Sequence, residues 1–163
     1  MATGTFLQWL SGFLAGLVAG MAMGITSEVA ARLRIFKSSM FIVDGKFLLR
    51  NFGMEGSPKL VYLAGVPMHL VTSGVFGAMY PVAAGLAGLE TLSVGLTAFY
   101  VFLLWLSMLF IALPTAGQGF FGSKAGPLTW LEQVLLHIVF FVIYYGMLAV
   151  AYHPPTALSQ TIR

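Results

Sequence analysis

Two histidines and one glutamate lie within long apolar stretches of this chain, where a titratable side chain is costly to bury. His69 follows Tyr62 by seven residues, and His137 follows Trp130 by the same number. At about 1.5 Å per residue, a helix would carry each imidazole roughly 10 Å past its aromatic neighbour. Glu28 closes a third apolar stretch. Because ionisable residues inside a membrane span mark functional sites by default, these three side chains are the first candidates for chemistry.

Two imidazoles at one depth are a suitable pair of axial ligands for a haem iron. We therefore expect haem b, or another tetrapyrrole, as one cofactor that could bind between His69 and His137. Gly74 and Gly77 follow His69 in the same apolar stretch and would leave a face without side chains for the macrocycle. In this interpretation the protein is an electron-carrier subunit.

A metal ion bound by Glu28, His69 and His137 is the alternative to haem, since imidazole and carboxylate are common metal ligands. A di-iron site is not favoured, because Glu132 precedes His137 by five residues and not by the three of a Glu-x-x-His motif. A quinone or proton site around Glu28 is a further alternative. The remaining interpretation is structural, with each histidine forming an interhelical hydrogen bond worth about 1 kcal/mol.

Four apolar runs must position these residues. Of the 163 residues, 59% are hydrophobic and only 8% are charged, whereas soluble proteins carry about 25% charged residues. Each run reaches the roughly 20 residues with which a helix crosses a bilayer. The chain is thus predicted to be all-α, a single integral membrane four-helix bundle. The predicted spans cover residues 6–31, 60–89, 92–113 and 128–152.

The two halves of the chain share a pattern. "HLVTSGVFGAMY" in the second span and "HIVFFVIYYGML" in the fourth both begin at a histidine and continue into glycine and tyrosine. An even number of crossings separates them, so this pattern predicts two parallel helix-pair repeats.

Basic residues gather in two of the three connections between spans. Six lie between the first and second spans, one lies between the third and fourth, and the second connection has none. The positive-inside rule therefore places both basic connections in the cytoplasm and both termini outside, in a bacterial inner membrane. Residues 36–58 mix Lys46 and Arg50 with aromatic and aliphatic residues, which predicts a segment along the membrane interface. The expected partners are the lipid bilayer and other membrane proteins, not nucleic acid.

A glycine occupies every fourth position of the first span, at Gly12, Gly16, Gly20 and Gly24, and Glu28 takes the next step. Such a stripe lets the backbone of another helix approach closely, with a right-handed crossing near −40°. The stripe is longer than a flat cofactor would need. It therefore predicts helix packing, either within this chain, with a second copy, or with another subunit.

The phrases "HLVTSGVFGAMY", "LPTAGQGFFG" and "LLHIVFFVIYYGML" resemble those of small bacterial four-helix membrane proteins, the YagU-like group among them. The shared traits are a span ending in Pro-x-x-Gly-x-Gly-x-Phe and a helix that starts at a histidine. The resemblance covers the second to fourth spans and implies a compact four-helix fold without an assigned activity. The glycine stripe, Glu28 and the long basic connection are not part of it.

These features favour a small accessory subunit of a larger membrane complex, such as a respiratory or photosynthetic one. Four short spans with almost no extramembrane domain leave little that could act alone. The chain contains no phosphate-binding loop, no Ser-His-Asp order and no metalloprotease motif, so we do not expect an enzyme in its own right.

Overall fold

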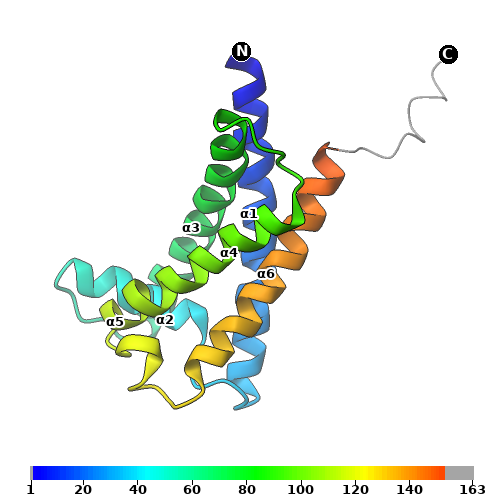
Figure 1. Ribbon diagram of the computed structural model, residues 1–163. Helices are drawn as coiled ribbons and strands as arrows, with labels where there is room; N and C mark the ends of the chain where they lie inside the picture. The colour runs from blue at the N-terminus through cyan, green and yellow to red at the C-terminus, as the bar shows by residue number, and fades with distance from the viewer. Residues whose placement is uncertain (1, 153–163) are drawn as a thin grey trace.

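The computed structural model describes residues 2–152, and every regular element within this range is helical (Figure 1). The long helices are α1 (Ala2–Arg32), α3 (Pro58–Leu86), α4 (Val94–Ser107) and α6 (Thr129–Tyr152). The shorter elements are α2 (Met40–Asn51), the π-helix η1 (Met108–Ala112), α5 (Leu113–Thr115) and the 3₁₀ turn η2 (Phe120–Gly122).

Four segments of this range are long and apolar enough to cross a membrane, namely residues 5–32, 58–86, 94–115 and 129–152. This confirms the all-α four-helix membrane fold, with span bounds close to those predicted. The second span ends at Leu86, three residues earlier than expected. There the Leu89 amide donates to the Ala84 carbonyl at 2.8 Å and Gly88 adopts a φ of +66°, a glycine-terminated helix end that the apolar sequence run does not reveal.

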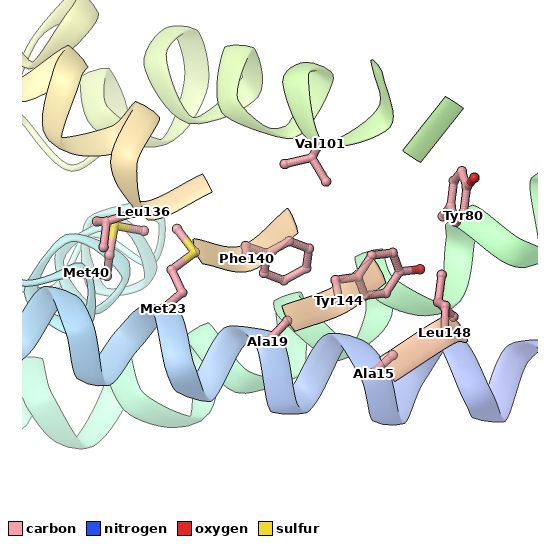
Figure 2. Packing of buried hydrophobic residues seen from close by; sticks show 10 residues of the cluster. All are labelled: Ala15, Ala19, Met23, Met40, Tyr80, Val101, Leu136, Phe140, Tyr144 and Leu148. Carbon is pink, nitrogen blue, oxygen red and sulfur yellow. The ribbon is translucent and has the colours of Figure 1, made fainter. Parts of the chain in front are cut away.

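Helix α1 is the centre of the bundle, because α3 and α6 pack along two of its faces (Figure 1). The α6 side uses small residues of α1 against large residues of α6. Ala15, Ala19 and Met23 lie against a stripe in which every fourth residue of α6 is apolar (Figure 2). That stripe consists of Leu136, Phe140, Tyr144 and Leu148.

The glycine stripe of α1 faces α3 of the same chain. A Cβ on Gly12 would overlap the Gly77 carbonyl, and one on Gly16 would overlap the Ser73 carbonyl. Further along, Gly20 lies against the Ser73 side chain. The backbones of α1 and α3 are therefore in direct contact, which is how small residues stabilise helix pairs in lipid.

Helix α3 carries a matching four-residue stripe, so that the two surfaces fit along most of their length. Its members are Gly65, His69, Ser73, Gly77 and Pro81. The last glycine of the α1 stripe, Gly24, faces the Phe41 ring at 2.6 Å and the His69 ring at 3.2 Å from where a Cβ would stand. The stripe thus ends at a histidine.

Helix α2 lies within the segment predicted to follow the membrane interface, and it packs closely on α3. A Cβ on Gly45 would overlap the Val61 carbonyl, and one on Gly65 would overlap the Phe41 carbonyl. This pair of glycines brings the two backbones together. As a result, Asp44 of α2 is buried although it belongs to a connection between spans.

The packing predicts that Gly16→Ala destabilises the bundle by about 1–3 kcal/mol, the usual effect of overpacking a close contact. The matched control is Gly146→Ala, since a Cβ there meets no atom within 4 Å and alanine favours a helix by about 0.5–1 kcal/mol. Thermal unfolding in detergent, followed by near-UV circular dichroism, measures both. Equal melting temperatures for the two variants would contradict a direct α1–α3 backbone contact.

Candidate functional site

His69 is the polar centre of the bundle and bonds to two other helices. Its Nδ1 lies 2.7 Å from Oδ2 of Asp44 on α2, and its Nε2 lies 3.0 Å from the Gly20 carbonyl on α1. The Phe41 ring stands edge-on to the imidazole at 5.5 Å. His69 is 3% exposed and Asp44 is 9% exposed. The ring is therefore held from three sides, with neither nitrogen free.

The two hydrogen bonds determine how many protons the His69–Asp44 pair holds. A carbonyl can only accept, so Nε2 must donate to Gly20. The 2.7 Å contact between Nδ1 and Oδ2 then contains one further proton, either on the imidazole or on the carboxyl group. In both cases the pair has no net charge, which is the form that a buried, low-dielectric site tolerates.

His137 on α6 differs from His69 in that only one of its ring nitrogens is hydrogen-bonded to a described residue. Its Nδ1 donates to the carbonyl of Gln133, one turn earlier, at 2.8 Å. The ring is 8% exposed, and no salt bridge joins it to a carboxylate within residues 2–152. The neutral ring therefore carries a lone pair on Nε2, and no side chain or carbonyl of the described residues donates to or accepts from that atom.

Both histidines line one cavity of about 280 Å³ between α3, α4 and α6. Its wall is mainly apolar and includes four methionines, whose flexible side chains adapt to ligands of different shape. The methionines are Met23, Met40, Met68 and Met108, and Asp44 also reaches the wall. Figure 2 shows Met40 beside Leu136 and Met23 beside Phe140. Met23, Met40 and Phe140 all line this cavity.

Two of the three hydroxyl groups in the wall already donate hydrogen bonds within their own helices. The Thr72 hydroxyl donates to the Met68 carbonyl at 2.8 Å, and the Ser107 hydroxyl donates to the Leu104 carbonyl at 2.7 Å. The third hydroxyl, on Ser73, makes no hydrogen bond with another described residue. The lining residues thus offer the lone pair of His137 and one free hydroxyl.

The π-helix η1 forms another part of the same wall. Met108, Ile111 and Ala112 line the cavity, and the Leu113 amide bonds five residues back to the Met108 carbonyl. Pro114 follows and has no N–H for the fourth residue before it, which favours a wider turn at this point. Single π turns of this kind occur frequently at functional sites.

Glu28 lies apart from the two histidines, contrary to the grouping expected from its depth. Its carboxylate accepts from Arg32 Nε at 2.7 Å and from the Tyr62 hydroxyl at 3.0 Å. Among residues 2–152, no group of three or more His, Asp or Glu side chains lies close enough to hold a metal ion. The predicted metal site of Glu28, His69 and His137 is therefore not assembled, because Glu28 lies closer to the N-terminal end of α3 than His69 does and bonds to Tyr62, seven residues before that histidine.

The two glycines predicted to make room for a haem face α1 instead. Gly74 lies against the Phe13 ring, and Gly77 lies against Gly12 and Gly16. Since both nitrogens of His69 are engaged, axial ligation by His69 would require breaking its bond to Gly20 or to Asp44. In this arrangement the residues do not fit a bis-histidine haem.

Asp44 is the site residue that sequence reasoning missed. Residues 36–58 were predicted to lie along the membrane interface, so Asp44 was not expected to be buried. One signal was available: Asp44 is the only acidic residue of "FIVDGKFLLRNF" and is followed by Gly45, which permits close helix contact.

The geometry predicts that Asp44→Ala destabilises the protein by about 1–3 kcal/mol, since His69 Nδ1 would lose its buried partner. Asp44→Asn is expected to cost less, because the amide can donate to Nδ1 while Nε2 still donates to Gly20. Thermal unfolding measures both, with Glu55→Gln as a control at an exposed acid. If Asp44→Asn proved as destabilising as Asp44→Ala, the shared-proton arrangement would be wrong.

No match was found when the chain was compared with known protein families, with curated proteins and with solved structures. The resemblance to the YagU-like group stays a prediction. The function therefore has to be argued from the geometry of the site.

Proposed function

We propose that this protein is an intramembrane binding protein for a small, mainly apolar molecule that carries a hydroxyl group, of the quinol or phenol class. The sequence predicted a quinone or proton site around Glu28. We place the binding site instead in the cavity that His69, Asp44 and His137 line. The observation that carries it is that His137, whose Nε2 forms no hydrogen bond with the described residues, lines an apolar cavity.

The wall of the cavity supports this class of ligand in two ways. Small-molecule sites are mostly apolar and have a few convergent polar groups that orient the ligand, as this one does. A hydroxyl could donate to His137 Nε2. The Thr72 and Ser107 hydroxyls are already donating, so Ser73 is the hydroxyl of the wall that is left to donate to a ligand.

The His69–Asp44 pair supports a role in proton exchange at the same cavity. His69 Nδ1 and Asp44 Oδ2 lie 2.7 Å apart, and the hydrogen bond between them contains one proton. Asp44 also lines the cavity. A quinol hydroxyl that transferred its proton to His137 would leave a quinolate beside an imidazolium, so the cavity would gain no net charge. Titratable groups arranged in this way are typical of proton-linked sites in membranes.

Binding of duroquinol, measured by anaerobic calorimetry on the protein in detergent, tests the proposal. His137→Leu removes the acceptor and is expected to weaken binding about tenfold, the effect of one hydrogen bond of roughly 1.4 kcal/mol. His137→Gln retains an acceptor oxygen and is the matched control, with smaller loss. Ala112→Leu, which adds bulk to the cavity wall, is expected to weaken binding without changing His137.

Equal binding by His137→Leu and the original protein would contradict the proposal, as would a loss of binding in His137→Gln as large as in His137→Leu. Absorption spectroscopy of the same sample distinguishes quinol binding from the haem alternative. A reduced-minus-oxidised α band that disappears in His69→Ala and His137→Ala would favour the electron carrier instead.

The accessory-subunit role stays a prediction beside this one. Large apolar side chains are exposed along α4 and α6, among them Phe99, Phe102, Ile138 and Val142. Such faces can contact either lipid or a transmembrane helix of another subunit. The accessory-subunit role and the quinol-binding role are compatible, because an accessory subunit can carry a ligand site.

We also propose that the basic connections face the cytoplasm of a bacterial inner membrane. In support, α1 begins and α6 ends at one end of the bundle, while residues 33–57 and 116–128 lie at the other (Figure 1). Five of the seven basic residues of the connections are in those two segments, and the other two, Arg32 and Lys59, lie in the adjoining turns of α1 and α3. The C-terminal tail, predicted to lie outside the cell, falls beyond the described residues.

Alkaline phosphatase, which is active only outside the cytoplasm, tests this orientation. A fusion after Tyr152 is expected to be active and an insertion within residues 33–39 inactive. Each fusion is normalised to the amount of protein in the membrane. The reverse pattern would place the basic connections outside.

A further inference from the structure

A second, larger cavity lies at the end of the bundle where the basic connections gather. It has a volume of about 790 Å³ and opens between α2, the residues after α5, and the segment before α6. Four of the chain's eight basic residues line it, namely Lys37, Lys46, Arg50 and Lys124. None of these residues belongs to the site of His69 and His137.

The residues that line this cavity carry an excess of positive charge. Glu55 is the only acidic residue among those that line it, which leaves an excess of three positive charges. The two salt bridges within residues 2–152 join other groups, Arg32 to Glu28 and His69 to Asp44. The Glu132 carboxylate, which is not part of the lining, accepts a hydrogen bond from the Lys37 backbone amide at 3.2 Å and also interacts electrostatically with Lys37.

Glycines of the segment 117–126 make the room in which three of these cations lie. A Cβ on Gly117 would overlap the Arg50 guanidinium. One on Gly119 would stand 3.2 Å from Cγ of Lys124, and one on Gly126 would stand 3.0 Å from Cγ of Lys37. Gly117 and Gly119 also have φ values of +84° and +75°, which favour glycine. The segment 117–126 thus leaves space at its glycines for three basic side chains to pack against its backbone.

Uncharged polar groups complete the lining. Gln118 is 8% exposed and its Nε2 donates to the Ser38 hydroxyl at 3.3 Å. Its Oε1 receives no hydrogen bond from the described residues. Both residues line the cavity, so hydroxyl and amide groups stand beside the cations, as in sites for polar headgroups.

We propose that this cavity binds a phosphate group, carried either by an anionic lipid or by a soluble phosphate ester. Guanidinium and ammonium groups are the usual partners of phosphate oxygens. The cavity lies at the ends of spans, the level at which lipid headgroups are found, and basic pockets between spans are known to bind them. A phosphodiester or a phosphate monoester satisfies the same cations.

Native mass spectrometry of the full chain in detergent tests the proposal with three probes added separately. These are phosphatidylglycerol, the zwitterionic phosphatidylcholine, and glycerol 3-phosphate. Lys46→Gln with Arg50→Gln removes two charges from the cavity. Arg34→Gln with Lys59→Gln is the matched control, because it removes two charges from the same end of the bundle outside the cavity.

The Lys46/Arg50 variant is expected to bind the phosphate probe about 30-fold more weakly, since each basic residue contributes roughly 1 kcal/mol at a charged lipid surface. The control variant is expected to change binding little, and the melting temperatures of both show whether they fold. Preference for phosphatidylglycerol alone supports a lipid source, and binding of glycerol 3-phosphate supports a soluble one. Equal losses in both variants, or binding of neither phosphatidylglycerol nor glycerol 3-phosphate above that of phosphatidylcholine, would overturn the proposal.

Discussion

The close contact between the backbones of α1 and α3 is the constraint on which the other features of this molecule depend. At Gly12, Gly16 and Gly20 there is no space for a Cβ, because α3 occupies it. In lipid there is little hydrophobic force to hold helices together, so dispersion contacts at this short range take its place. The contact also brings the carbonyl of Gly20 to His69. A larger residue along this stripe would move the histidine away from its acceptor.

From that contact the polar site follows in steps. The stripe of α3 that meets α1 contains His69, and Gly65 of the same stripe admits α2 against α3. Helix α2 then delivers Asp44 to the far side of the imidazole. Three helices are thereby joined at one ring. The buried hydrogen bonds stabilise the bundle only because each donor has an acceptor, and an unpaired group there would be costly.

Much of the fold could be predicted from the sequence, since the apolar runs have the length that a bilayer requires and the glycine stripe indicates a close helix contact. The grouping of residues around the site could not be predicted in the same way. Residue counting placed Glu28 level with the histidines, but it does not give the register of α1 against α3. In the structure Gly20 and Gly24 stand level with His69, and Glu28 meets Tyr62, seven residues earlier on α3. Asp44 was not predicted as a site residue, because a connection between spans was not expected to fold back into the bundle.

The wide turn η1 has a consequence for how this cavity could arise or disappear in evolution. A π turn contains one residue more than the α-helical turn it replaces, so it can form by insertion of a single residue. Removing one residue from Met108–Ala112 would restore a regular helix and leave its two flanks nearly in their present orientation, because five residues of a π turn cover about the same angle as four of an α-helix. The widened turn would be lost, and with it the wall that Met108, Ile111 and Ala112 give the cavity, while the length and hydropathy of the span would hardly change. The residue count of the third span, more than its composition, would therefore distinguish chains that keep the cavity from those that have lost it.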